Sequence, residues 1–136
     1  MKDKHRILVV DDDPDMVEQI TLILRQDGYE VISANGREEA EQALLSGRPD
    51  LAVVDLMMEE QDSGFVLCHE IRRLYPGTPV IVLTSVKSET GLSFDAFSGE
   101  QQSWIGAEKL LDKPIRAEQL RSEVRGLLAK GSGRHT

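Results

Sequence analysis

The sequence is poor in the residue types that several specialised classes of protein need. Its 136 residues include one cysteine, three phenylalanines, two tyrosines and one tryptophan. A single cysteine excludes an intramolecular disulfide and argues against a thiolate metal site. We expect Cys68 to be a small buried apolar side chain, because cysteine is among the most buried residue types. This composition suits a reducing cytoplasm.

Positive charge is also scarce. Sixteen Lys and Arg residues against 24 Asp and Glu residues give a formal net charge of −8. Proteins that bind nucleic acid carry a basic patch, so we expect no direct contact with nucleic acid. The apolar runs are short, such as Ile7–Val10 and Val80–Leu83, so we expect no membrane insertion. Residues 1–5, MKDKH, lead into the first apolar run without a cleavable signal pattern.

What is present is a regular alternation of short apolar runs with longer stretches of helical period, which is typical of βα units around a parallel sheet. It predicts an α/β, flavodoxin-like, doubly wound sheet of five parallel strands in the order 2-1-3-4-5, with an extended, atypical region between the fourth and fifth strands. The strands are expected at residues 6–10, 30–34, 50–55, 80–84 and 109–112, and the helices at residues 14–27, 37–46, 65–75 and 113–130. We expect one domain over residues 1–130 and a flexible tail over residues 131–136.

Aspartates gather at the ends of two of these strands. Asp11 and Asp12 leave the first strand and Asp55 ends the third. In the expected order these strands are neighbours, so their carboxyl ends open into one crevice. Like charges ~4 Å apart repel by roughly 4 kcal/mol at an effective dielectric of 20. Because Mg²⁺ prefers carboxylate oxygens, we interpret the three acids as a metal site. Asp13, an expected N-cap before Pro14, and Asp15 instead suit the first turn of a helix.

Thr84 and Lys113 end the fourth and fifth expected strands, at the same edge of the sheet. A carboxylate, a metal, a hydroxyl group and a lysine suit phosphoryl transfer. The carboxylate attacks, the metal and the lysine neutralise the equatorial oxygens, and the hydroxyl group binds one of them. Asp55 is the best candidate nucleophile, because it stands alone at a central strand end and faces the acid pair. The product would be an acyl phosphate.

Four stretches of this sequence, ILVVDDDP, DLAVVDLMM, VIVLTS and LLDKPI, resemble the receiver domains of two-component response regulators, and the resemblance covers roughly residues 5–130. It implies a site made by six residues: the phospho-acceptor Asp55, the Mg²⁺ ligands Asp11, Asp12 and the Met57 main-chain carbonyl, and the phosphoryl contacts Thr84 and Lys113. It also implies a sensor histidine kinase or a phosphotransfer protein as phosphate donor. The output would be contact with a downstream protein target, without enzymatic turnover of small substrates.

The sequence departs from the pattern of the receivers in three places. Glu59 stands where receivers commonly have proline, and Leu110 stands where many have a Tyr or Phe that turns inward on activation. Any switch must therefore use Thr84 and backbone movement. The stretch between Thr84 and Lys113 is longer than usual and contains three of the aromatic residues: Phe94, Phe97 and Trp104. They either pin this loop to its own domain or form a docking surface for a partner.

The resemblance also bears on the lifetime of the phosphorylated state. Met57 lies two residues after Asp55, and Val86 lies two residues after Thr84. In receivers these positions flank the path of the water that hydrolyses the acyl phosphate. Neither side chain can orient a water molecule by hydrogen bonding, and both can obstruct it. We therefore predict a long-lived phosphorylated state.

Three other functions compete with a phosphoryl-accepting domain. An aspartyl phosphohydrolase of the haloacid dehalogenase type would have a second Asp two residues after the nucleophile, where this chain has Met57. A nucleotide or flavin binder would have a glycine-rich loop where this chain has DDDPD, and the G-x-x-x-x-G-K-[ST] motif is absent. The third alternative is a receiver-like module that docks a partner without phosphotransfer.

Overall fold

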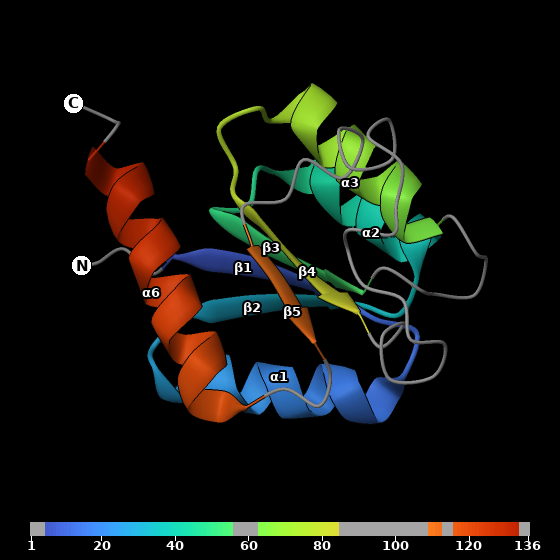
Figure 1. Cartoon of the computed structure of the whole chain (residues 1–136). Helices are drawn as coiled ribbons and strands as arrows, with labels where there is room; N and C mark the ends of the chain where they lie inside the picture. The colour runs from blue at the N-terminus through green and yellow to red at the C-terminus, as the bar shows by residue number, and fades with distance from the viewer. Residues whose placement is uncertain (1–4, 56–62, 85–108, 113–115, 134–136) are drawn as a thin grey trace.

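The computed structural model describes residues 5–55, 63–84, 109–112 and 116–133. Within these residues, parallel strands form one sheet in the order β2-β1-β3-β4-β5, and helices cover both of its faces (Figure 1). The strands are β1 (Arg6–Val10), β2 (Glu30–Ala34), β3 (Leu51–Asp55), β4 (Val80–Thr84) and β5 (Lys109–Asp112). The described helices are α1 (Pro14–Gln26), α2 (Arg37–Ser46), α3 (Ser63–Leu74) and α6 (Ala117–Gly133). The expected α/β, flavodoxin-like class is confirmed.

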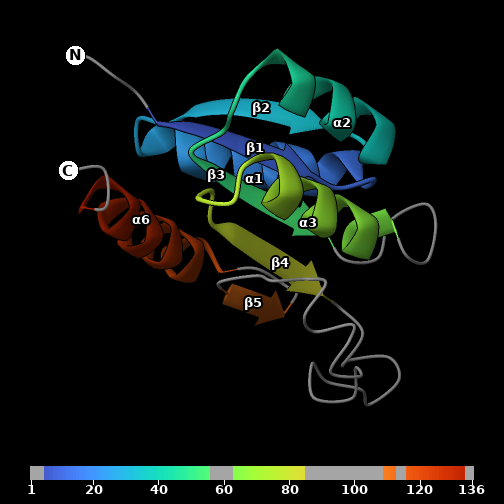
Figure 2. The same cartoon turned by 90° about the horizontal axis from the view of Figure 1, so that it is seen from above.

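The strands divide their side chains between two cores. Ile7 and Val9 of β1 belong to one buried cluster, together with apolar residues of α1 and α6. Leu8 and Val10 belong to the other, together with residues of α2 and α3. Successive strand residues point to opposite faces, so a strand with helices on both sides is apolar throughout. All residues of β3 are buried. The strand lies between β1 and β4 in the middle of the sheet (Figure 2), so Asp55 stands at the end of a central element.

Helix α1 begins and ends where the sequence predicts. The side chain of Asp13 accepts a hydrogen bond from the main-chain N–H of Asp15, and Pro14 occupies the first turn. The helix ends before Gly28, whose φ of +90° lies in the left-handed region that glycine adopts without strain. The helix therefore has a fixed start directly after the end of β1.

Two helices differ from the sequence expectation at their ends. Helix α3 begins at Ser63, earlier than the expected residue 65. Helix α6 runs past Lys130 to Gly133, although glycine costs about 1 kcal/mol in a helix relative to alanine. Helix α6 turns an apolar face toward the sheet, and the four residues of this face are all buried: Leu120, Val124, Leu127 and Leu128.

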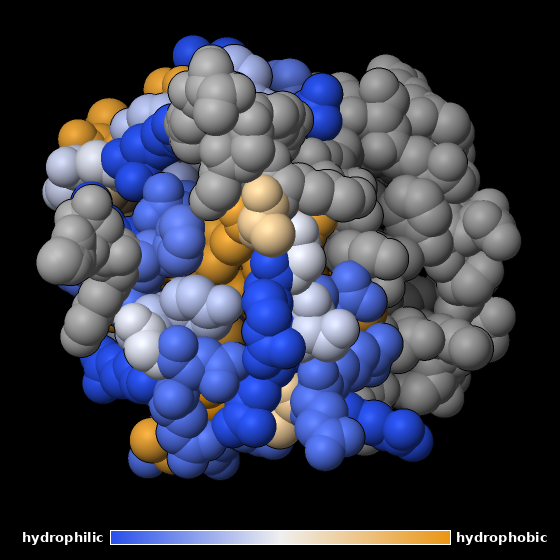
Figure 3. Space-filling view, turned by 90° about the vertical axis from the view of Figure 1, so that its left-hand side faces the viewer, coloured by the Kyte–Doolittle hydropathy of each residue, from blue (hydrophilic) through white to orange (hydrophobic). Residues whose placement is uncertain are grey.

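The outward face of α6 is polar. On the side of the molecule that carries this helix, the described surface is largely hydrophilic, and its apolar atoms lie in small separate areas (Figure 3). Among the described residues, no helix combines the length and the apolar character needed to cross a bilayer.

The structure confirms the expectation for Cys68, which is fully buried. Several other expectations fall on residues outside those described. They concern the extended region between β4 and β5, with Phe94, Phe97 and Trp104, and the loop that contains Glu59. The backbone of Leu110 pairs with Val82 in the sheet, whereas its side chain is outside the description. These expectations stay predictions.

Candidate functional site

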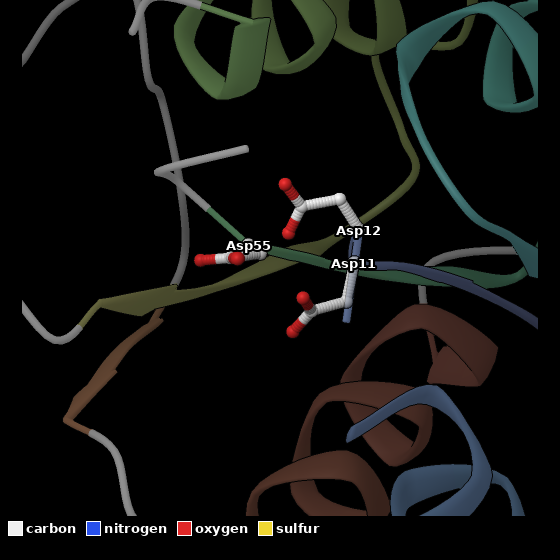
Figure 4. A group of neighbouring side chains, drawn as sticks. All are labelled: Asp11, Asp12 and Asp55. Atoms are coloured by element: carbon white, nitrogen blue, oxygen red, sulfur yellow. The ribbon is translucent and has the colours of Figure 1, made fainter. Parts of the chain in front are cut away.

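The three predicted acids come together at the carboxyl ends of two neighbouring strands. Strands β1 and β3 are paired, with Val10 in register with Val54. Asp11 and Asp12 follow β1 directly, and Asp55 is the last residue of β3. One carboxylate oxygen from each of the three residues lies within 4.8 Å of the others. Figure 4 shows the three side chains extending from these strand ends into the same region.

The burial of the three acids is unequal. Asp11 is 0% exposed and Asp55 is 3% exposed, whereas Asp12 is an exposed residue. One oxygen of each of the three carboxylates lies within 4.8 Å of the others, and two unit charges about 5 Å apart repel by about 3 kcal/mol at an effective dielectric of 20. Two carboxylates of the cluster are thus buried and the third is exposed to solvent. A cation bound among them would offset their repulsion.

The donor set fits a hard divalent cation. The group contains carboxylate oxygens and neither histidine nor cysteine. Oxygen ligands of this kind suit Mg²⁺ or Ca²⁺, whereas zinc sites usually include imidazole or thiolate ligands. Mg²⁺ takes one or two carboxylates and completes its octahedron with water and substrate oxygens. Asp11, Asp12 and Asp55 therefore fit Mg²⁺ with ligand positions left for a second molecule.

Asp11 is held in place by two main-chain hydrogen bonds. Its N–H donates to the carbonyl oxygen of Ala34 at the end of β2, at 3.2 Å. Its Oδ1 accepts from the N–H of Asp13 at 3.0 Å. The prediction from the sequence assigned Asp13 to helix capping alone and missed this second contact. The signal was available, because aspartates commonly accept from the N–H two residues on, and Asp11, Asp13 and Asp15 are spaced in that way.

The remaining predicted site residues are described in part or not at all. Thr84 is the last residue of β4 and pairs with Asp112 of β5, which places its backbone at the same edge of the sheet as Asp55. The side chain of Thr84 is outside the description, as are Lys113 and Met57. The structure thus brings together Asp11, Asp12 and Asp55, and the contributions of the other three residues stay predictions.

Residues 7–125 match the family model of the response regulator receiver domain. The chain belongs to this family. As a receiver, it has the fold of signalling regulators, which are generally not turnover enzymes. Receiver domains bind Mg²⁺ at an acidic pocket, and the cluster of Asp11, Asp12 and Asp55 is compatible with such a site.

Curated relatives are similar to this receiver over nearly all of its length. The DNA-binding response regulator MtrA of Mycolicibacterium smegmatis is 33% identical over 127 residues, which are 93% of this chain and 52% of the relative. The alkaline phosphatase synthesis transcriptional regulatory protein PhoP of Bacillus subtilis is 31% identical over 125 residues, which are 92% of this chain and 49% of the relative. The chain thus spans about half the length of these two relatives.

Solved structures share the fold. A CheY-like receiver domain protein from Methanospirillum hungatei superposes with a TM-score of 0.81 at 24% identity, over 97% of this chain and 99% of that one. A response regulator from Thermotoga maritima superposes with a TM-score of 0.77 at 27% identity, over 93% of this chain and 98% of that one. Both similarities extend over more than nine-tenths of this chain.

Proposed function

We propose that this receiver domain accepts a phosphoryl group on Asp55 from a phosphohistidine of a sensor histidine kinase or a phosphotransfer protein. The observation that supports the proposal best is the convergence of Asp11, Asp12 and Asp55, with carboxylate oxygens within 4.8 Å of one another. Carboxylates held this close repel one another, and a cation among them offsets that repulsion. In this proposal Asp11, Asp12, Asp55 and the main-chain carbonyl of Met57 hold Mg²⁺.

The chemistry assigns each group a part. A carboxylate oxygen of Asp55 attacks the phosphorus atom, the P–N bond of the phosphohistidine breaks, and the imidazole leaves with its bonding electron pair and takes up a proton. The product is an acyl phosphate on Asp55 and a free histidine. Mg²⁺, when bound, supplies positive charge for the transferred oxygens. The Thr84 hydroxyl group and the Lys113 ammonium group are proposed to bind two of these oxygens.

The burial of Asp55 supports its role as the acceptor. Asp55 is 3% exposed and ends β3, the strand that is buried along its whole length. A rigid, central element fixes the nucleophile, so little reorganisation is needed when a phosphoryl donor arrives. Asp12, in contrast, is exposed and lies on the solvent side of the cluster. Of the three acids, Asp55 therefore combines a fixed position with a location opposite the acid pair.

Output by protein contacts completes the proposal. The net charge of −8 disfavours direct contact between this domain and nucleic acid. Phosphorylation would change the contacts of the domain with a downstream protein target, and the signalling would take place in the cytoplasm. We propose residues 1–130 as the receiver and residues 131–136 as its tail, the first part of which continues α6 as far as Gly133.

Intact-mass measurement after incubation with acetyl phosphate and Mg²⁺ tests the proposal. The parent protein and Asp15→Asn, which removes an exposed carboxylate outside the cluster, are expected to gain one phosphoryl group. Asp55→Asn and the parent in excess EDTA are expected to gain none. A gain in Asp55→Asn equal to that of the parent, or no gain in any sample, would contradict the proposal and favour a docking module without phosphotransfer.

A further inference from the structure

Asp13 makes two separate contacts with its neighbours in the turn between β1 and α1. Its side-chain Oδ1 accepts from the N–H of Asp15 at 3.0 Å and caps α1. Its own N–H donates to Oδ1 of Asp11, also at 3.0 Å. One residue therefore joins the start of the helix to a buried carboxylate of the acidic cluster.

The position of Asp11 depends on both ends of this turn. On the strand side, the Asp11 N–H is fixed by the carbonyl oxygen of Ala34. On the helix side, its carboxylate accepts from the Asp13 N–H, and Asp13 is itself tied to the helix by its N-cap hydrogen bond from the Asp15 N–H. Asp12 lies between these two fixed residues in the chain. The same turn therefore also directs the backbone that carries Asp12.

We propose that Asp13 is a positioning residue for the metal site, which acts through its N-cap hydrogen bond and its main-chain N–H rather than through its charge. This inference rests on the proposed function, because it takes Asp11, Asp12 and Asp55 as the ligands of Mg²⁺. Groups that hydrogen-bond to metal ligands orient them, and their loss commonly weakens metal binding by about 10- to 100-fold.

Two other roles for Asp13 predict different behaviour. If its negative charge attracted the cation, an uncharged cap would weaken binding as much as a cap that is missing. If its carboxylate were itself a ligand, asparagine would be a poor substitute for the same reason. A positioning role requires only a side chain that accepts from the Asp15 N–H. Asn and Ser cap helices about as well as Asp does, whereas Ala does not.

Calorimetric titration with MgCl₂ at about 0.15 M salt separates these roles. We expect Asp13→Ala to bind Mg²⁺ about tenfold more weakly than the parent. Asp13→Asn and Asp13→Ser should stay within about twofold of the parent. Asp15→Asn is the matched charge control and should also stay within about twofold, because its main-chain N–H is retained. In the same samples, the residue 13 amide should exchange its hydrogen faster in Asp13→Ala than in Asp13→Asn.

The outcomes of this titration are distinct. A parent protein that binds no Mg²⁺ would overturn the proposed function, and with it this inference. A parent that binds Mg²⁺ no more tightly than Asp13→Ala would overturn the inference alone. Equal weakening in Asp13→Asn and Asp13→Ala would also overturn it, since charge or direct ligation would then be the cause. Should Asp13→Ala fail to fold, Asp13→Gly replaces it, because glycine is tolerated at the N-cap but offers no side-chain acceptor.

Discussion

Asp11 and Asp55 lie at the ends of paired parallel strands, both almost fully buried, in a cluster whose carboxylate oxygens are within 4.8 Å of one another. Their repulsion makes the metal-free fold less stable than it would otherwise be. We expect Asp55→Asn to raise the free energy of unfolding by about 1–2 kcal/mol without divalent ions. The substitution removes one of two charges whose mutual repulsion amounts to roughly 3 kcal/mol at a dielectric of 20, and we expect part of that energy to be recovered. Urea denaturation in EDTA measures the difference.

The same pair predicts a response to Mg²⁺. A ligand that binds only the folded state stabilises it by about 2.7 kcal/mol at a hundredfold excess over its Kd. The parent and Asp15→Asn should show this gain on addition of MgCl₂, and Asp55→Asn should show little of it. A parent whose unfolding free energy is insensitive to MgCl₂, or an Asp55→Asn variant less stable than the parent in EDTA, would contradict this account of the cluster.

The phosphorylated state is expected to decay slowly, because Met57 and Val86 offer no hydrogen-bonding side chain to orient the attacking water. General-base or orienting groups typically contribute about 10²- to 10⁴-fold to such steps. The decay is followed by intact mass after the phosphodonor is removed, in the presence of Mg²⁺. Met57→Glu is expected to shorten the lifetime, and Met57→Leu to leave it unchanged. Loss of phosphate from the parent within seconds would refute the prediction.

The elements that the sequence predicted well are those defined by apolar period and by caps. The bounds of β1 and β4 follow the apolar runs closely, since a strand with helices on both faces is apolar along most of its length. The start of α1 was predicted from Asp13 and Pro14, and its end from Gly28. Each of these signals is local, so the sequence alone contains it.

Contacts between side chain and main chain were harder to predict. Asp11 Oδ1 accepts from the Asp13 N–H, and this bond follows from the turn geometry rather than from any hydrophobic period. In α1, Val17 is buried, whereas its neighbour Met16 is partly buried and packs against the same core. Adjacent helical residues differ by about 100° around the axis, so period alone decides poorly between two neighbouring apolar residues.

Tyr29 is expected to reduce stability at high pH. Burial and the nearby charge of Asp27 raise its pKa above the ordinary value of 10.0, against a smaller opposite effect of Arg125. Above about pH 10 the unfolded chain therefore loses the phenolic proton while the folded chain retains it, so stability falls as pH rises through that range. Urea denaturation at about pH 9 and about pH 11 should show a steeper decline for the parent than for Tyr29→Phe. Equal declines would contradict the assignment.

The reactivity of the Cys68 thiol can report whether Mg²⁺ binding at the acidic cluster stabilises the core. Its side chain is fully buried, and burial raises its pKa to about 12. The thiolate is the form of cysteine that attacks a disulfide reagent and displaces its leaving thiolate, so at about pH 8 the folded protein should react roughly 10³-fold or more slowly than the protein in denaturant. If the thiol becomes accessible only by unfolding, Mg²⁺ should slow the reaction of the parent by the same factor by which it stabilises the fold, since both depend on the population of the open state. Asp55→Asn should react at a rate independent of Mg²⁺. If the rate in the parent is also independent of Mg²⁺, the thiol becomes accessible by local opening of α3 that leaves the metal site intact.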